Sequence, residues 1–517
     1  MHETDGNAAT HFVDRHRGGE RASHPAFVEI DGAQRQLSYA ELAEQSDRVP
    51  SLLRERGLRR EERAIMLVLD QIEFPLIFWG CLKAGVVPVP VSTLLATPVY
   101  EGIFADSRAR AVFVSAPLLP LIAPFLADHP TVETVYVIGP SDESVAGAVD
   151  FGAALSASAP SGCVSASADE TAFWLYSSGS TGQPKGVRHL HSSLRATAET
   201  YASEVLQIDA SDRVYSAAKL FFAYGLGNAM SFPLSVGATS YLLAGRPTPE
   251  VVIDALRAYE PTVFCGVPTL YAGLLSTLAQ RGEALPPCRC CISAGEALPA
   301  EIGRRWRDLV GTDILDGVGS TEMLHIFLSN RPGAVDYGAS GEAVPGYTLK
   351  LVNDAGHEAQ DGEIGELLVD GPSASEGYWQ LREKNRATFE GRWTRTGDKY
   401  QRDGQRLVYC GRTDDLFKVG GIWVAPFEVE QALIEHDAVL ECAVVAARDD
   451  DDLDKPKAFV VLEPGHRGDA AMVETLKAHV QAVVGKWKYP RWVAFVDALP
   501  KTPTGKIQRF KLRDNAG

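Results

Sequence analysis

The chain has 517 residues, more than one hydrophobic core usually organises, so two or more domains are expected. Its 67 acidic and 50 basic residues give a formal net charge of −17, which argues against general binding to nucleic acid or to an anionic membrane. The composition is 45% apolar, which supports packed cores, but no run of about 18 apolar residues predicts a membrane span. The polar, acidic start lacks the features of a signal peptide, and a cytoplasmic protein is therefore expected.

Strand and helix patterns alternate over the first 140 residues. Arg63–Leu69 and Val86–Val91 are expected strands, with the apolar helix Ile72–Ala84 between them, and further strands are expected at 111–114 and 134–138. The prolines of the second strand favour a sheet edge, because proline cannot donate a ladder hydrogen bond. This rhythm predicts an α/β fold with parallel sheets and packed helices.

A glycine- and hydroxyl-rich loop follows at Tyr176–Gly186, with the sequence YSSGSTGQPKG. Glycine lets backbone N–H groups approach an anion closely, and hydroxyls and a lysine add donors and charge. We expect Thr171–Tyr176 to be a buried strand and Ser192–Tyr201 a helix, so that the loop leads from a strand to a helix-bearing segment. It is not a Walker A loop, and a flexible Ser/Gly linker is the alternative interpretation.

Three later segments combine apolar residues with glycine-rich turns. Leu220–Gly227 is either a ligand-facing loop or a helix start buried in the core. Cys291–Leu298 and Ile314–Glu322 both indicate a strand that ends in a turn, which is where ligands bind in open parallel sheets. The last segment adds a hydroxyl and a carboxylate suited to a phosphate and its magnesium, although a capped helix start would have the same pattern.

The eight cysteines include the cluster Cys288, Cys290 and Cys291. No second cluster follows at the spacing of zinc ligands, so reduced structural thiols are expected.

After Asp354, short strands between glycine turns predict a small β-rich subdomain. Asp398 follows one such turn, where it is either a ribose ligand or an ordinary turn residue. A polar joint at 411–415 precedes a new α+β unit, and a domain boundary is expected there. Near the end, two prolines and a glycine present Lys506 from a loop.

Taken in order, these segments resemble the adenylate-forming superfamily of acyl-CoA ligases, peptide-synthetase adenylation domains and luciferases, over nearly the whole chain. The resemblance implies an N-terminal domain, 1–413, with the ATP and aryl-acid sites. It also implies a small mobile α+β lid domain, 414–517, which carries the catalytic lysine and rotates about a hinge at Asp414 between two half-reactions.

The same resemblance assigns roles to individual residues. Lys506, Glu322 and Thr181 would be catalytic, with Lys506 between the attacking carboxylate and the α-phosphate and Glu322 holding Mg²⁺. Asp398 and Arg412 would bind the ribose. The complete nucleotide set implied is Ser177, Ser178, Gly179, Ser180, Thr181, Gly182, Lys185, Gly295, Glu296, Ala297, Asp316, Gly317, Val318, Gly319, Ser320, Thr321, Asp398 and Arg412.

Within the superfamily, the segments 221–227 and 316–330 are most similar to the benzoate–CoA ligase branch. A small residue at Ala223 would leave a flat slot for a ring, and His325 or Tyr224 could pair with a ring substituent, unless His325 is a plain core histidine. The implied aryl-acid pocket is Phe222, Ala223, Tyr224, Gly225, Gly319, His325, Ile326 and Lys418. The implied thiol tunnel is Gly420, Gly421 and Trp423.

The resemblance therefore implies an ATP-dependent ligase that converts benzoate, or a substituted benzoate such as 2-aminobenzoate or hydroxybenzoate, into aroyl-AMP and then into a CoA thioester. ATP, Mg²⁺ and CoA would be required. An alternative acceptor is the phosphopantetheine arm of a carrier protein, and a luciferase-like oxygenase is a remote alternative. The expected partners are an aromatic acid and the thiol acceptor, with no nucleic acid and no membrane, and a homodimer stays open.

Overall fold

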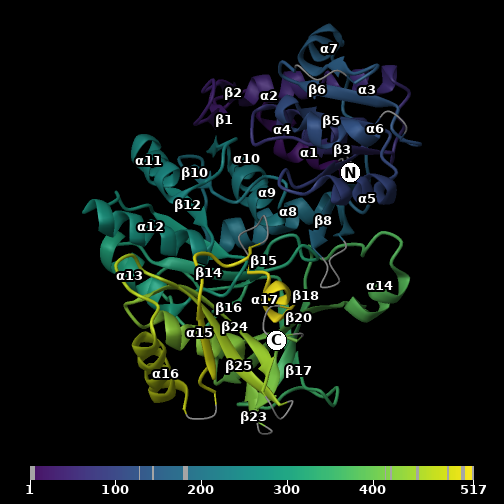
Figure 1. The fold of residues 1–517 in the computed structure, drawn as a ribbon. Helices are drawn as coiled ribbons and strands as arrows, with labels where there is room; N and C mark the ends of the chain where they lie inside the picture. The colour runs from purple at the N-terminus through teal and green to yellow at the C-terminus, as the bar shows by residue number, and fades with distance from the viewer. Residues whose placement is uncertain are drawn as a thin grey trace.

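The computed structural model describes residues 6–126, 129–141, 145–178, 184–413, 415–419, 422–449, 453–485, 488–501 and 507–514. These residues form six sheets with helices packed around them (Figure 1). The expected α/β class, with a large multi-sheet N-terminal part and a small C-terminal part, is confirmed. Among the described helices, none combines the length and the apolar character that crossing a membrane would require.

The largest sheet has nine strands in the order β16-β15-β14-β13-β12-β10-β11-β1-β2. The six strands from β14 to β1 are parallel, and β15, β16 and β2 are antiparallel additions at the edges. The strands are β1 (Pro25–Glu29), β2 (Gln36–Ser38), β10 (Arg213–Ser216), β11 (Thr239–Leu242), β12 (Val263–Gly266), β13 (Cys290–Ala294), β14 (Ile314–Gly319), β15 (Ile326–Ser329) and β16 (Glu342–Ala343).

A second, fully parallel sheet has the order β4-β3-β5-β6-β7. Side chains alternate along its strands, so Ala64 and Met66 enter one core while Ile65 and Leu67 enter another. The proline-bearing β4 lies at the edge, as its sequence predicts. The strands are β3 (Arg63–Leu67), β4 (Val87–Pro90), β5 (Ala111–Ser115), β6 (Thr134–Ile138) and β7 (Val149–Asp150).

Helices cover these sheets. Ser38 and Glu41 form the reciprocal capping box that starts α2, and the chain begins a new helix, α3, at Val49 with Pro50 in its first turn. The helices are α1 (Ala8–Phe12), α2 (Tyr39–Ser46), α3 (Val49–Glu55), α4 (Glu73–Ala84), α5 (Thr97–Ser107), α6 (Ala123–Leu126), α7 (Phe151–Ala157), α9 (Ala223–Leu226), α10 (Phe232–Val236), α11 (Pro249–Tyr259), α12 (Pro268–Arg281) and α13 (Ala300–Val310), with 3₁₀-helices η1 (Asp14–His16) and η2 (Ala116–Leu121) and the π-helical turn η4 (Gly227–Ser231).

The phosphate-type loop joins two antiparallel strands, β8 (Thr171–Ser178) and β9 (Pro184–Leu190). The expectation that the loop leads from a strand directly to a helix-bearing segment was therefore wrong, because the strand β9 lies between the loop and the helix. The helix follows the second strand as α8 (His191–Thr197), which continues as the π-helix η3 (Ala198–Val205). Pro184 can start β9 because its missing N–H falls at the first position of the strand.

The β-rich subdomain is an antiparallel sheet of β17-β18-β20-β19, with β21 also pairing with β20. Asp398 was expected to follow a turn between separate strands. It lies instead inside β20, next to a register shift at Lys399 and Tyr400. The elements are β17 (Thr348–Val352), β18 (Ile364–Asp370), α14 (Arg382–Thr388), β19 (Phe389–Glu390), β20 (Trp393–Asp403) and β21 (Arg406–Arg412).

The C-terminal elements have two small cores built almost wholly from their own side chains. Figure 1 shows α15 near α13, and these two helices are in contact. The elements are β22 (Phe417–Val419), β23 (Ile422–Val424), α15 (Pro426–Ile434), β24 (Val439–Arg448), β25 (Asp454–Leu462), α16 (Ala470–Val484), β26 (Trp492–Phe495) and α17 (Arg509–Asp514). The hinge residue Asp414 lies outside the described residues, so the limits 1–413 and 414–517 stay predictions.

Candidate active site

The carboxyl ends of β13 and β14 lie side by side, as expected for neighbouring parallel strands. The first continues into Gly295–Ala297, where Gly295 has φ +98°, a conformation that favours glycine. The second ends in the partly buried residues Val318 and Gly319, and Asp316 before them is buried. The backbone N–H of Leu298 donates to Oδ2 of Asp316 at 3.4 Å, and burial raises the pKa of this carboxyl to about 8. The two turns predicted to hold adenine therefore meet at one carboxyl group.

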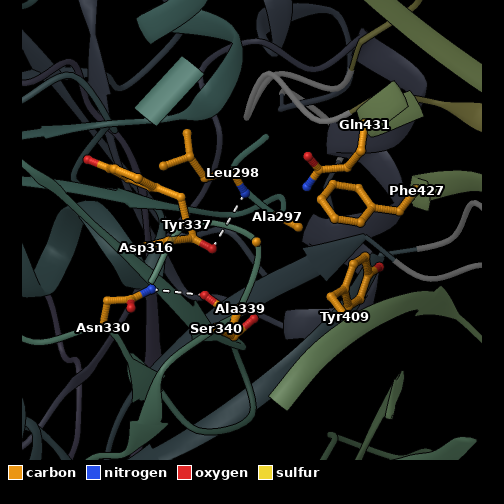
Figure 2. Close-up of a pocket in the computed structure, with 11 residues that line it drawn as sticks. Ala297, Leu298, Asp316, Asn330, Tyr337, Ala339, Ser340, Tyr409, Phe427 and Gln431 are labelled. Carbon is orange, nitrogen blue, oxygen red and sulfur yellow. Dashed lines mark hydrogen bonds between the residues drawn. The ribbon is translucent and has the colours of Figure 1, made fainter. Parts of the chain in front are cut away.

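A pocket beside Asp316 includes side chains from three parts of the chain (Figure 2). Phe427 and Gln431 come from α15, and Gln431 accepts a hydrogen bond from the N–H of Ala300 at 3.1 Å. The ring of Phe427 packs edge-on against Tyr409 with 5.4 Å between centroids. The pocket is lined by Ala297, Leu298, Asp316, Asn330, Tyr337, Gly338, Ala339, Ser340, Tyr409, Phe427 and Gln431.

Glycines are required where β14 pairs with its neighbour β15 in the sheet. A Cβ at Gly317 would lie 2.7 Å from Cδ1 of Ile326, and a Cβ at Gly319 would lie 2.6 Å from the carbonyl oxygen of His325. Val318 pairs with Leu328 in the same hairpin. After the strand, Ser320 Oγ accepts a hydrogen bond from the N–H of Met323, and the carbonyl of Thr321 accepts one from Leu324. This tight turn brings Glu322 and His325 out of the sheet.

The hairpin of β8 and β9, which is predicted to bind phosphate and is called the phosphate hairpin below, places Ser177 opposite Lys185. The Oγ atom of Ser177 is buried and has no hydrogen-bond partner among the residues that the structure describes. A buried hydroxyl of this kind is suited to a ligand oxygen, because an unpaired polar group is costly. The predicted residues Gly179, Ser180, Thr181 and Gly182 and the side chain of Ser178 lie outside the described part.

A lysine, a tyrosine and a glutamate meet beside this hairpin. Nζ of Lys185 lies 3.2 Å from the hydroxyl oxygen of Tyr378 and 4.3 Å from the centre of its ring. The same hydroxyl donates to Oε1 of Glu322 at 2.7 Å, and Nζ is 3.8 Å from that oxygen. Burial lowers the pKa of Lys185. A partly desolvated ammonium group at this place is suited to a phosphate.

Asp398 and Arg412 face each other across β20 and β21. Nη1 of Arg412 donates to Oδ1 of Asp398 at 3.0 Å and to the carbonyl of Thr396 at 3.0 Å. The positive charge of Arg412 also helps to lower the pKa of Lys185. A paired carboxylate and guanidinium of this kind suit a diol such as ribose.

Lys506 belongs to the segment 502–506, which lies outside the described residues. The residues on either side, Lys501 and Ile507, form a β-bridge. The N–H of Ile507 donates to Oε1 of Glu296 at 2.6 Å. The residue directly after Lys506 therefore contacts the turn after β13.

An aromatic cluster surrounds His325, which is 3% exposed. Its ring lies 4.5 Å from Phe232, 5.3 Å from Tyr201 and 5.6 Å from Tyr224, centroid to centroid. Nε2 is 3.3 Å from the carbonyl of Tyr224, and Nδ1 is buried without a hydrogen-bond partner in the described part of the chain. Burial lowers the pKa of His325 to about 3, so the imidazole is neutral at pH 7.

The segment before this cluster is closely packed. A Cβ at Gly225 would lie 2.1 Å from the carbonyl oxygen of Lys219, and the hydroxyl of Tyr224 is 3.2 Å from the carbonyls of Gly266 and Ile292. Phe222 and Ala223 are partly buried beside Tyr224. The predicted residues Gly420 and Gly421 and the side chains of Lys418 and Trp423 lie outside the described residues.

Within the described ranges, no three His, Cys, Asp or Glu side chains gather to hold a metal. Glu322 is nevertheless compatible with Mg²⁺, which proteins commonly bind through one or two carboxylates together with substrate phosphates. All eight cysteines are free, and seven are buried, in agreement with structural thiols.

Sequence reasoning missed Tyr378, Tyr409, Phe427 and Gln431. None of them lies in a motif whose spacing indicates phosphate or nucleotide binding. Tyr378 reaches the site because its segment pairs with β9, and Phe427 and Gln431 reach it because α15 docks on the turn before α13. Only a prediction of these long-range contacts could have found them.

Two family models match the chain. The AMP-binding enzyme model matches residues 15–379, and the AMP-binding enzyme C-terminal domain model matches residues 428–506. The first of these covers more than half of the chain.

Several of the similar proteins are named as aromatic-acid ligases. The chain is 49% identical to a 4-hydroxybenzoate–CoA/benzoate–CoA ligase of Rhodopseudomonas palustris, over 99% of this chain and 94% of the relative. It is 51% identical to a benzoate–CoA ligase of Thauera aromatica, over 98% and 95% of the two chains. A crystal structure of an anthranilate–CoA ligase with anthranoyl-AMP has a TM-score of 0.93 at 39% identity, with 99% of this chain and 97% of that chain covered. The chain therefore belongs to the AMP-binding, adenylate-forming enzymes, in their benzoate–CoA ligase branch.

Proposed function

We propose that this enzyme activates benzoate, or a benzoate with one small polar substituent, as aroyl-AMP and transfers the aroyl group to CoA. The relatives named for benzoate and 4-hydroxybenzoate share about half of their residues with it. The neutral aromatic cluster around His325 supports an uncharged ring as the bound group.

The observation that carries this proposal is the short turn between β14 and β15. It places Glu322 beside Lys185 and the phosphate hairpin, and three residues later it places His325 in the aromatic cluster. An aryl acid whose ring lies in the cluster would therefore direct its carboxylate towards bound triphosphate.

In the first half-reaction, a carboxylate oxygen attacks the α-phosphorus of ATP and the bond to pyrophosphate breaks. A carboxylate is a weak nucleophile and the phosphorus is surrounded by negative oxygens, so alignment and nearby positive charge are needed. Lys185 and the hairpin hydroxyls would hold the β- and γ-phosphates, and Asp398 and Arg412 the ribose. Lys506 would neutralise the charge that develops between the carboxylate and the α-phosphate.

Glu322 would hold Mg²⁺, which neutralises charge on the phosphate oxygens when it is bound. Thr181 is proposed as a further phosphate ligand from the same hairpin. Gly295–Ala297 and Asp316–Thr321 would form the adenine and α-phosphate site.

In the second half-reaction, the thiol attacks the aroyl carbonyl and AMP leaves. We propose that the C-terminal domain rotates at Asp414, so that Gly420, Gly421 and Trp423 replace Lys506 and line the path of the pantetheine arm. The hydrogen bond from Ile507 to Glu296 supports a first conformation in which the lysine loop lies at the nucleotide turn.

His325 is the group proposed to recognise a ring substituent. If Nε2–H donates to the carbonyl of Tyr224, the neutral ring presents Nδ1 as an acceptor for a hydroxyl or amino group. The hydroxyl of Tyr224 is close to two backbone carbonyls and is less available as a donor.

The test is an assay of the purified protein with ATP, Mg²⁺ and a panel of benzoate, 2-aminobenzoate, hydroxybenzoates, cinnamate and hexanoate, each with and without CoA. Mass spectrometry identifies the products. An aroyl-AMP without CoA and an aroyl-CoA with it, from a benzoate, is the expected result. Accumulation of the adenylate in the presence of CoA would instead indicate a carrier-protein thiol as acceptor, and no aroyl-AMP from any acid would refute the proposal.

A further inference from the structure

The segment 375–379 connects β9, which carries Lys185, to the turn after β14, which carries Glu322. The N–H of Trp379 donates to the carbonyl of Gly186 at 2.8 Å, and Arg188 exchanges backbone hydrogen bonds with Glu376 and Gly377. These contacts lay the segment along β9. The N–H of Ser375 donates to the carbonyl of Glu322 at 2.8 Å, so the same segment is also tied to the turn after β14.

Tyr378 lies in the middle of this segment and is 3% exposed. Its backbone is held by Asn385, whose Oδ1 accepts from the N–H of Tyr378 at 2.7 Å and whose Nδ2 donates to its carbonyl at 2.9 Å. The ring of Tyr378 also packs against the ring of Phe389, with 5.4 Å between the two centroids. The side chain therefore has little freedom, and its hydroxyl has a defined position between Lys185 and Glu322.

The hydroxyl uses both of its hydrogen-bonding functions there. It donates to the glutamate at 2.7 Å and is 3.2 Å from the ammonium nitrogen, which supplies a proton to its lone pair. The two charged groups stay 3.8 Å apart, whereas direct charge-assisted N–H···O bonds are about 2.7–2.9 Å long. The tyrosine oxygen thus bonds the lysine and the glutamate at the same time and competes with a direct bond between them.

We propose that Tyr378 is a positioning residue whose hydroxyl keeps Lys185 and Glu322 from closing into a direct ion pair. This inference rests on the proposed function, in which the lysine binds the triphosphate and the glutamate its metal. A closed pair would satisfy each charge with the other and compete with both ligands. The aromatic ring adds a second function, because its face lies 4.3 Å from the ammonium nitrogen and holds the lysine end in place.

The substitution Tyr378→Phe separates these functions, since it keeps the ring and removes the oxygen. Without the hydroxyl, Lys185 can move about 1 Å towards Glu322 and form the direct pair. The lysine is then less available to the β- and γ-phosphates. AMP lacks these phosphates, so its binding is expected to be unaffected.

Calorimetric titrations of the full-length protein with adenosine 5′-(β,γ-imido)triphosphate and with AMP, both in EDTA, test this directly. For Tyr378→Phe we expect the Kd for the triphosphate analogue to rise about tenfold, with the Kd for AMP within twofold of wild type. Tyr100→Phe is the matched control, because that buried hydroxyl also donates once, to Ser92 O, and accepts once, from Leu95 N, but lies elsewhere. It should change neither affinity.

The Glu322→Gln background supplies the second arm. There the carboxylate charge that attracts the lysine is absent, so adding Tyr378→Phe should change the Kd for the analogue by less than twofold. Three results would each overturn the proposed role of Tyr378. These are an unchanged affinity of Tyr378→Phe for the analogue, an equal loss of affinity for AMP, and the full tenfold loss in the Glu322→Gln background. These titrations need neither acid nor CoA, so a failure of the proposed aryl-acid chemistry would be seen separately in the product assay.

Discussion

Gly227→Ala is the substitution that most directly tests the position of the aryl-acid pocket. Gly227 begins the π-helical turn η4 with φ −64°, which any residue can adopt, so backbone strain does not enter. A Cβ at this position would lie 2.4 Å from Cδ2 and 2.8 Å from Nε2 of His325. Ordinary carbon contacts are about 3.5–4.0 Å, and the imidazole must therefore move by about 1 Å.

The displacement has two costs. Inserting a methyl group into a packed core commonly costs about 1–3 kcal/mol. Moving the ring also weakens the contact between Nε2 and the carbonyl of Tyr224, a hydrogen bond worth about 1 kcal/mol. If the ring moves into the slot proposed for benzoate, a loss of about 1.4 kcal/mol of binding corresponds to a tenfold rise in KM.

The assay is pyrophosphate exchange with benzoate and ATP varied separately, together with thermal unfolding. We expect the KM for benzoate to rise at least about tenfold, the KM for ATP to stay within twofold, and Tm to fall. Gly102→Ala is the matched control, because Gly102 also lies in a helix and its Cβ would meet no atom within 4 Å. It should be neutral or slightly stabilising, by up to about 1 kcal/mol. An unchanged benzoate KM in a destabilised Gly227→Ala protein would show that His325 does not border the ring.

Three further outcomes are expected. Asp316 has a pKa raised by burial from 3.8 to about 8, so the native state holds this proton more tightly than the unfolded chain. The stability that this proton contributes is therefore complete below pH 3.8 and is lost as pH rises towards 8. The variant Asp316→Asn cannot ionise, so its Tm should exceed that of wild type by an amount that grows between pH 3.8 and pH 8. Tm curves that stay parallel over this range would contradict the prediction. Lys506→Ala should lower aroyl-AMP formation at least about 100-fold while leaving thiolation of supplied aroyl-AMP within about twofold, as single-turnover kinetics of each half-reaction can measure, whereas equal losses would argue against its assigned role. Ala223→Phe should raise the KM for benzoate about tenfold or more by filling the slot, and unchanged kinetics with benzoate would place the pocket elsewhere.

Local chemistry made several elements predictable. Ser38 and Glu41 specify a helix start because each side chain bonds the other's backbone within one turn, and Pro88 and Pro90 specify an edge because they lack N–H donors. The order of the glycine-rich segments identified the family, because these glycines also meet a local requirement. Backbone that must approach a ligand or a neighbouring strand closely, as at Gly317 and Gly319, requires glycine wherever it occurs.

The sequence alone thus determined the α/β class and the family, and it supplied the candidate nucleotide-binding segments. The tertiary structure decided how those segments are completed. It added β9 after the phosphate loop, and it brought Tyr378 to Lys185 across 193 positions and Gln431 to Ala300 across 131. An isolated tyrosine or glutamine has no distinctive local pattern, and its role depends on burial and partners that arise only when distant segments pack. For this reason the candidate ligands could be proposed from motifs, whereas Tyr378, which contacts two of them, could not.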